Sequence, residues 1–394
     1  MQLDFDYRPG EDLPYSALAR LREAGPVVWS DNLNGWLVSS YAGVREVLGD
    51  VSRFTSAGTP VAEVFGLEAM LLNDTPLHHT MRAVWARAVS VAAVQARMAE
   101  LQANARRVLE PIASRLNAGE AVDFIPVFRD FVMEFIALSF DVSRENLDVF
   151  ENWSRMSADT PALGLEEGSE AAERHNKARA DVVALVAAEM ENRRKRLAQG
   201  EQPSDLVTPM VAAVGQNGIT EKMAADNLFN FILGAMDTTE KWLGNVVVRL
   251  AEDPELRARV DADRKLITPM VDEVMRFDTV AQTIQRRVRE PGTELAGQHL
   301  KGGDAVYLML GAANRDGSEF SDPDRFDLSR TGSTNLGFGY GFHHCLGINI
   351  ARTEVVAFIG VLLDLFGPLR VAECDRGNSW GLWGPRGLEL ALAG

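Results

Sequence analysis

One segment constrains the fold of this chain more than any other. Residues 219–254, ITEKMAADNLFNFILGAMDTTEKWLGNVVVRLAEDP, are apolar nearly all round the middle of a helical repeat, which predicts a buried helix. Thr220 is a candidate cap, Glu221 favours the first turn, and Pro254 ends the helix. At ~1.5 Å per residue the helix would span roughly 45 Å. The rest of the fold must therefore pack round it.

Polar side chains interrupt the apolar middle of this predicted helix. They are Asn227, Asn230, Asp237, Thr238 and Thr239. Polar groups on a buried helix need hydrogen-bond partners, and any one of them can be satisfied by a neighbour or by the helix backbone. Three consecutive polar residues at 237–239 are harder to explain in that way, and this cluster indicates a functional site.

The remaining chain is predicted to form one domain, residues 1–394, that is mainly helical with small β-sheets to one side. Helical patterns dominate residues 77–266, and strand-rich parts lie at about 27–40, 279–310 and 380–392. In the first of these, two short runs of Val, Trp and Leu flank a turn at 31–35, which predicts a hairpin. The chain contains no solenoid repeat and no long linker.

Composition excludes several classes of function. The formal net charge is −16, with 40 Lys and Arg against 56 Asp and Glu, which argues against nucleic acid as a partner. The N-terminus lacks the pattern of a signal peptide, and no window reaches about 18 uncharged apolar residues, so we expect no membrane helix. With only Cys345 and Cys374, the chain is expected to be cytoplasmic, with reduced thiols.

The stretch 337–347, GFGYGFHHCLG, surrounds Cys345 with glycines. The apolar run that follows predicts a buried helix, so Cys345 lies close to a helix N-terminus, where backbone N–H groups lower the pKa of a thiol. Such a cysteine suits a nucleophile with His343 or His344 as base, a zinc ligand, or the single axial ligand of haem iron. Zinc would need further ligands at matching spacing, whereas haem needs only one cysteine. The glycine-rich context argues against an inert buried cysteine.

Residues 338–347, FGYGFHHCLG, resemble the haem-ligand loop of the cytochrome P450 family. Cys345 takes the ligand position, and Gly339, Gly341 and Gly347 are the glycines of the pattern. Four further segments match in the same order, and the resemblance covers essentially the whole chain. It implies a cytochrome P450-type fold in which haem b lies between two buried helices, with the Cys345 thiolate on the iron. The soluble bacterial members are the most similar type.

Two of these segments carry structural and catalytic roles in the family. Glu273 and Arg276 resemble its Glu-x-x-Arg pair, which shares one helix face and is joined by an arginine from a later segment, here Arg325. Residues 234–239, GAMDTT, resemble its oxygen-activation segment. Gly234 and Ala235 would leave room beside the haem, although the family usually has Ala before Gly. Asp237 and Thr238 resemble the acid–alcohol pair that delivers protons during oxygen activation.

The resemblance also implies which residues bind the haem propionates. His78 and Arg82 in DTPLHHTMR match the pair that binds one propionate. Arg286 matches the strand arginine that serves the other, with the adjacent Arg287 as the alternative. His343 matches a loop residue that also touches a propionate. An arginine suits this role because its planar guanidinium can engage a carboxylate through two donors.

The implied function is a haem-dependent monooxygenase. It would hydroxylate or O-dealkylate a small to medium hydrophobic substrate with O2 and two electrons from a ferredoxin and its NAD(P)H-dependent reductase. A basic patch including Arg87 and Arg352 is the candidate ferredoxin site. A peroxide-driven peroxygenase and a non-enzymatic haem-thiolate sensor or carrier are the alternatives, and the Asp237–Thr238 pair argues against both. The predicted pocket walls are residues 61–72, residues 279–284 with Thr283, and the pair Leu382 and Trp383. On the long helix they include Asn230, Leu233 and Gly234.

Overall fold

The computed structural model describes residues 15–59, 68–158, 168–331, 334–376 and 381–393. The chain divides into two compact units. The first, which we call the sheet unit, comprises Met1–Thr55, Met98–Phe128 and Thr238–Gly394. The second, the helical unit, comprises Ser56–Arg97 and Arg129–Asp237. The two units do not test whether residues 1–394 form a single domain, and that statement stays a prediction.

The long predicted helix is confirmed as α12 (Glu221–Glu252). Thr220 caps it, since its Oγ1 accepts a hydrogen bond of 3.1 Å from the backbone N–H of Met223. The next helix, α13 (Pro254–Ala262), begins at the expected proline, and Asp253 caps it by accepting from Leu256 N at 2.9 Å. Residues of α12 up to Asp237 belong to the helical unit, and those from Thr238 belong to the sheet unit.

A five-stranded sheet organises the sheet unit. Its order is β1 (Val27–Ser30), β2 (Gly35–Val38), β8 (Ala305–Met309), β5 (Thr283–Val288) and β3 (Phe54–Thr55). Strands β2 and β8 pair in parallel, and the other neighbours are antiparallel. The predicted hairpin at 27–40 is confirmed as β1 and β2. Trp29 faces Trp36 across it, with ring centroids 5.3 Å apart.

Both faces of this sheet are covered by helices. Because successive side chains of a strand point to opposite faces, Leu37 and Val38 enter different apolar clusters. The Val38 cluster includes residues of α2 (Tyr41–Gly49), and the Leu37 cluster includes residues of α1 (Tyr15–Ala24). The core of the sheet unit therefore lies on both sides of the five strands.

Two smaller sheets complete the strands of this unit. One has the order β4 (Val122–Asp123), β10 (Gly387–Leu392) and β9 (Leu369–Asp375), and the other pairs β6 (Gly292–Leu295) with β7 (Gln298–Lys301). The strand predicted at 380–392 is thus β10, but its hairpin partner β9 lies before that range. Only Leu369 of β9 is buried, and the polar residues of this strand break the alternation that would predict it from sequence. Cys374 lies in this strand.

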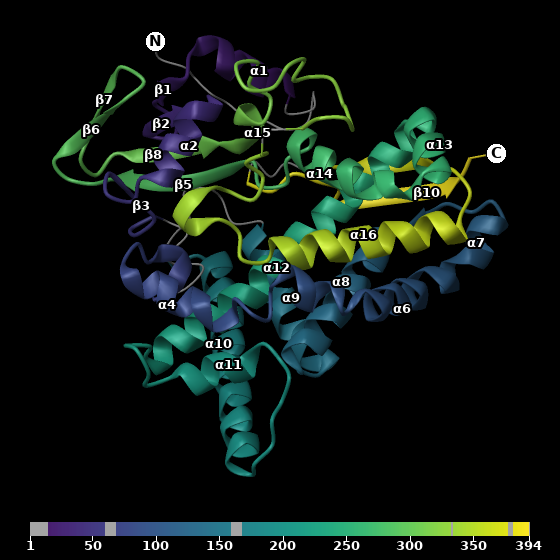
Figure 1. Ribbon diagram of the computed structural model, residues 1–394, viewed down its shortest axis with the longest axis horizontal. Helices are drawn as coiled ribbons and strands as arrows, with labels where there is room; N and C mark the ends of the chain where they lie inside the picture. The colour runs from purple at the N-terminus through teal and green to yellow at the C-terminus, as the bar shows by residue number, and fades with distance from the viewer. Residues whose placement is uncertain (1–14, 60–67, 159–167, 332–333, 377–380, 394) are drawn as a thin grey trace. The chain divides into compact units, whose positions relative to one another are not determined.

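The sheet unit contains further helices besides α1, α2, α13 and the second part of α12. They are α6 (Met98–Leu109), η2 (Glu110–Ile112), α7 (Ala113–Asn117), η3 (Arg264–Leu266), α14 (Ile267–Phe277), α15 (Leu310–Ala313), η4 (Gly341–His343) and α16 (Ile348–Leu365). Helix α16 packs along α6 and against α14 (Figure 1). This packing places the helix that follows the cysteine loop beside the helix that carries Glu273 and Arg276.

The helical unit contains the remaining helices: η1 (Met70–Leu72), α4 (Pro76–Trp85), α5 (Val91–Gln95), most of α8 (Ile125–Phe140), α9 (Arg144–Ala158), α10 (Glu170–Ala198) and α11 (Val207–Ala213). Trp85 is fully buried and donates its indole N–H to the Leu206 carbonyl at 2.7 Å. The predicted fold class, mainly helical with small sheets, is confirmed. Over the described ranges, no helix has the length and hydropathy that a bilayer crossing requires.

Candidate active site

The loop around Cys345 is shaped by two glycines in left-handed conformations. Gly339 has φ +70° and Gly341 has φ +68°, values that residues with a Cβ rarely adopt. At Gly341 an added Cβ would also lie 2.9 Å from the Leu48 carbonyl oxygen of α2, so only glycine fits there. The backbone N–H of Cys345 donates to the Phe338 carbonyl at 2.9 Å, which closes the loop just before α16. The predicted position of Cys345 near a helix N-terminus is confirmed.

Side chains from two helices hold this loop from outside. Trp242 of α12 packs edge-on against Phe338, with centroids 5.2 Å apart, and donates its indole N–H to the Val271 carbonyl at 3.1 Å. Arg45 of α2 lies over the Tyr340 ring at 4.3 Å and donates to its hydroxyl at 2.8 Å. The loop is therefore packed against α12 at Phe338 and against α2 at Tyr340.

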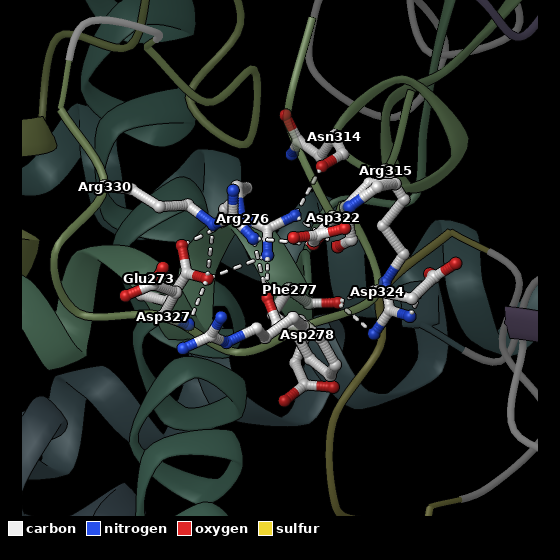
Figure 2. A network of polar contacts seen from close by, with 12 residues as sticks. Glu273, Arg276, Phe277, Asp278, Asn314, Arg315, Asp322, Asp324, Asp327 and Arg330 are labelled. Carbon is white, nitrogen blue, oxygen red and sulfur yellow. Dashed lines mark hydrogen bonds and ion pairs between the residues drawn. The ribbon is translucent and has the colours of Figure 1, made fainter. Parts of the chain in front are cut away.

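Glu273 and Arg276 form the centre of a buried polar network (Figure 2). The Arg276 guanidinium donates through Nε and one terminal nitrogen to the two Glu273 carboxylate oxygens, both at 2.8 Å. This bidentate geometry is the strongest form of such a pair. The other terminal nitrogen donates to the carbonyls of Asn314 and Pro323, both at 2.9 Å. The pair that was predicted from i,i+3 spacing is thus formed and inward-facing.

The third arginine of this network is Arg330, and the prediction of Arg325 was wrong for the side chain. Arg330 Nε donates to Glu273 Oε1 at 3.1 Å (Figure 2). Arg325 contributes its backbone carbonyl, which accepts from Arg276 at 3.2 Å and from Arg330 at 2.8 Å. The chain turns between Arg325 and Arg330, and this turn brings the Arg330 side chain to Glu273.

Asn314 connects the network to the start of the cysteine loop. Its Nδ2 donates to Thr279 Oγ1 at 2.8 Å, and that hydroxyl donates to the Arg276 carbonyl at 3.0 Å. Its Oδ1 accepts from the backbone N–H of Leu336 at 2.6 Å. Because the Leu336 carbonyl accepts from Gly339 N at 2.8 Å, the network supports the loop backbone through a continuous series of bonds.

Strand β5 distinguishes Arg286 from Arg287. Arg286 is only 6% exposed and donates to the Gln285 carbonyl at 2.7 Å. Arg287, on the opposite face, is half-buried and donates to the Gly303 carbonyl at 3.1 Å. Arg286 is therefore the buried arginine of the two, and Arg287 is the half-buried one.

In the helical unit, His78 and Arg82 lie one turn apart on α4, as their spacing predicted. His78 is 1% exposed, and its Nδ1 lies 2.9 Å from the Met70 carbonyl, so this nitrogen carries a proton and donates. Arg82 is half-buried. The ring of His78 is therefore fixed in orientation, with Nε2 on its other side.

The polar cluster of α12 is only partly buried. Asp237, Thr238 and Ala235 are half-buried, as is Asn230. Gly234 is exposed, and an added Cβ would meet no atom within 4 Å in the described part of the chain. Two neighbours on the helix are buried. Leu233, a predicted pocket residue, lies in the core, and Asn227 accepts from Met70 N at 2.9 Å and donates to the Met223 carbonyl at 2.7 Å.

The C-terminal turn separates two neighbouring candidates. Leu382 forms an isolated antiparallel bridge with Ala281, so these side chains share a face, and both are half-buried. Trp383 points to the opposite face and is 3% exposed. The half-buried position of this turn is therefore Leu382, and the predicted pocket residue Trp383 belongs to the core. Thr283 is half-buried, as expected for a pocket wall. Of the predicted loop 61–72, residues 61–67 lie outside the described residues.

Comparisons with known proteins decide the family. The family model for cytochrome P450 matches residues 28–369. The mycinamicin IV hydroxylase/epoxidase of Micromonospora griseorubida is 31% identical over 91% of this chain and 89% of its own. The cyclomarin C epoxidase CymV of Salinispora arenicola is 26% identical over 95% of both chains. This chain belongs to the cytochrome P450 family. It is a P450 monooxygenase.

A solved P450 structure supports the same fold. CYP109E1 from Bacillus megaterium, in complex with testosterone, superposes with a TM-score of 0.87 at 24% identity, covering 96% of this chain and 97% of that one. The P450 fold is therefore shared well beyond the motifs from which it was predicted. The resemblance stated from sequence is confirmed.

The P450 family implies a haem-thiolate cofactor, and the residues of the sheet unit fit it. One sulfur, Cys345, stands in a loop that packs against α2 and α12, and half-buried apolar residues flank it at Leu346 and Ile348. An added Cβ at Gly347 would meet no described atom within 4 Å, so protein packing alone does not require this glycine. Among the described residues, no group of three or more His, Cys, Asp or Glu side chains is arranged to hold a metal ion, so the zinc alternative lacks a ligand set there.

Proposed function

We propose that this P450 monooxygenase inserts one oxygen atom from O2 into a hydrophobic organic molecule, with Cys345 as the axial ligand of haem b. The observation that carries the proposal is the Cys345 loop, whose two left-handed glycines and external packing support a fixed sulfur position. The haem, when bound, supplies oxygen activation, which a thiolate ligand favours. Two relatives named for hydroxylation or epoxidation support those reactions here, and O-dealkylation is the variant that follows when hydroxylation occurs beside an ether.

Three kinds of side chain would serve the cofactor. Arg286, buried on β5, supplies a cation for one propionate, and its burial favours it over Arg287. The sequence pattern assigns His78 and Arg82 to the other propionate, and the contact of His78 Nδ1 with the Met70 carbonyl fixes the orientation of the ring. His343 stays a predicted propionate contact. Glu273, Arg276 and Arg330 act at a distance, since they hold the backbone before the loop.

Asp237 and Thr238 are proposed to move protons during oxygen activation. They are adjacent on α12 and half-buried, which suits a relay that exchanges protons with water. We expect Thr238→Ala to retain substrate binding but to lose coupling, so that reducing equivalents appear as hydrogen peroxide. Product formed per NAD(P)H consumed measures this, and unchanged coupling would remove Thr238 from the role.

The substrate is proposed to be small to medium in size and mainly apolar. In the sheet unit, Ala281, Thr283 and Leu382 are the half-buried residues that support a substrate-facing surface. Thr283 Oγ1 is buried and makes no hydrogen bond within the described residues, so it is suited to bind one polar group of the substrate. Asn230 of the helical unit stays a predicted contact.

Electrons are proposed to come from a ferredoxin and its reductase. Of the two candidate docking arginines, Arg352 donates to Asp272 at 2.7 Å, so its charge is already compensated. Arg87 is exposed and is the better candidate. Activity with hydrogen peroxide but none with a ferredoxin would instead favour a peroxygenase, and ligand-dependent spectra without any product would favour a sensor or carrier.

The decisive experiment compares two cysteines of the same chain. We expect the purified protein to bind haem, and its reduced carbonyl adduct to have the red-shifted Soret band of thiolate ligation. Cys345→Ser should abolish that band, whereas Cys374→Ser, in strand β9, should keep it. A carbonyl spectrum of the histidine type in the unmodified protein, or a thiolate band that survives in Cys345→Ser, would refute the proposal.

A further inference from the structure

The turn at 382–386 is in unusually close contact with helix α12, within the sheet unit. A Cβ added to Gly244 of α12 would lie 2.8 Å from Pro385 Cδ. A Cβ added to Gly384 of the turn would lie 2.7 Å from Lys241 Cβ. Glycines at both positions therefore let helix and turn approach more closely than other residues would allow. Lys241 Nζ also donates to the Pro385 carbonyl at 2.6 Å.

Asn245, next to Gly244, bonds the same turn and a second segment at once. It is 1% exposed, and its Nδ2 donates to the carbonyls of Trp383 at 3.1 Å and of Asp278 at 3.0 Å. Because both partners are acceptors, only the amide nitrogen can face them, and the orientation of the side chain is determined. Its Oδ1 is buried and accepts no hydrogen bond from the described residues.

The other side of the turn is bonded to the segment before β5. The backbone N–H of Trp383 donates to the Val280 carbonyl at 2.7 Å, and Gln282 N donates to the Gly381 carbonyl at 2.9 Å. Leu382 lies between these bonds, bridged to Ala281. The backbone on either side of Leu382 is thus bonded to α12 and to residues 280–282, while the Leu382 side chain remains half-buried.

We propose that Asn245 is a positioning residue for substrate recognition. By holding the Trp383 carbonyl, it sets the distance between Leu382 and α12 and prevents the turn from adapting to each ligand. A wall that cannot adapt discriminates by shape, so the substrate class is a compact, rigid hydrophobic molecule rather than a flexible chain. This inference rests on the proposed function, since it assumes that Leu382 faces the substrate.

The test uses two azoles as probes on the haem-loaded protein: imidazole, and the bulky aromatic azole econazole. We expect Asn245→Ala to weaken econazole binding about tenfold while imidazole affinity changes less than about twofold, since only the larger ligand depends on the position of an apolar wall. Asn104→Ala is the matched control, because Asn104 is also a buried amide of the sheet unit and bonds Arg107 within its own helix. It should change neither affinity.

Hydrogen exchange supplies a readout that needs no ligand. Peptides covering 381–387 should exchange faster in Asn245→Ala than in the unmodified protein, and they should not do so in Asn104→Ala. If Asn245→Ala does not fold, Asn245→Ser, which can keep one of the two bonds, takes its place. An intact thiolate carbonyl band with unchanged econazole affinity and unchanged exchange would overturn this inference alone. Absence of the band from the unmodified protein would overturn the proposed function instead.

Discussion

Two buried carboxylates, Glu273 within α14 and Asp278 directly after it, are stabilised in different ways. Glu273 meets an arginine of its own helix, and within the described ranges its hydrogen bonds come from Arg276 and from the segment that carries Asp327 and Arg330. Asp278, just beyond the helix, is bonded by the Tyr15 hydroxyl of α1 and by Arg249 of α12, the latter at 2.9 Å. One site depends on local spacing and the other on the packing of three helices.

The electrostatic consequence differs as well. Burial raises the pKa of Asp278 to about 6, although Arg376 and Arg315 act in the opposite direction. Burial also lowers the pKa of Arg249. Desolvation therefore outweighs the favourable charges at Asp278, which makes this site sensitive to pH. The comparison teaches that an ionised carboxylate in the core is stabilised most where an arginine of its own helix binds both of its oxygens.

The largest effect is expected at the Glu273 site. Arg276→Lys removes the bidentate pair and leaves several carbonyls without donors, so it should cost about 3–5 kcal/mol in the free energy of unfolding. Chemical denaturation measures this, together with the fraction of protein that shows the thiolate carbonyl band. A loss below 1 kcal/mol would show that the network does not support the loop.

The Asp278 site predicts a pH dependence of stability. Because its pKa is raised on folding, the group stabilises the fold fully below about pH 4, and this contribution is lost as pH rises through about 6, by roughly 3 kcal/mol in total. Asp278→Asn cannot titrate, so its unfolding free energy should fall less than that of the unmodified protein between pH 4 and 7. Parallel pH profiles for the two proteins would contradict the assignment.

A smaller effect separates the two arginines of the segment after α15. Arg330→Ala removes a bond to Glu273 and donors to three carbonyls, and should cost about 2 kcal/mol. Arg325→Ala keeps the carbonyl that the network uses and should cost less than about 0.5 kcal/mol. Thermal unfolding of both variants measures the difference. Equal losses of unfolding free energy would show that the Arg325 side chain contributes to the network as much as Arg330 does.

The smallest effect is expected where Arg45 meets Tyr340. Tyr340→Phe removes the hydrogen bond but keeps the ring under the guanidinium, so it should cost about 0.5–1 kcal/mol. A double-mutant cycle with Arg45→Ala isolates the coupling, which should be of the same size. A coupling near zero would mean that α2 holds the loop through Gly341 alone.

Prediction from the sequence succeeded where neighbours in the chain carry the information. The bounds of α12 follow from Thr220 and Pro254, and the Glu273–Arg276 pair follows from i,i+3 spacing. The prediction failed where a residue's role depends on a turn. Arg325 was predicted in place of Arg330 because the bend that brings Arg330 to Glu273 depends on tertiary contacts. Leu382 and Trp383 were predicted together as a pocket wall, because the bridge that separates their two faces cannot be located without its partner strand.

The sequence by itself determined the family, the cysteine loop and the principal helices. These features depend on glycine conformations, capping and apolar periodicity, all of which act within about ten residues of one another. Only the tertiary structure decided that Asn245 joins Asp278 to Trp383, that Arg286 is the buried arginine of β5, and that Leu382 keeps a half-buried face. Contacts between segments so distant in the chain are set by packing, which local propensities do not encode.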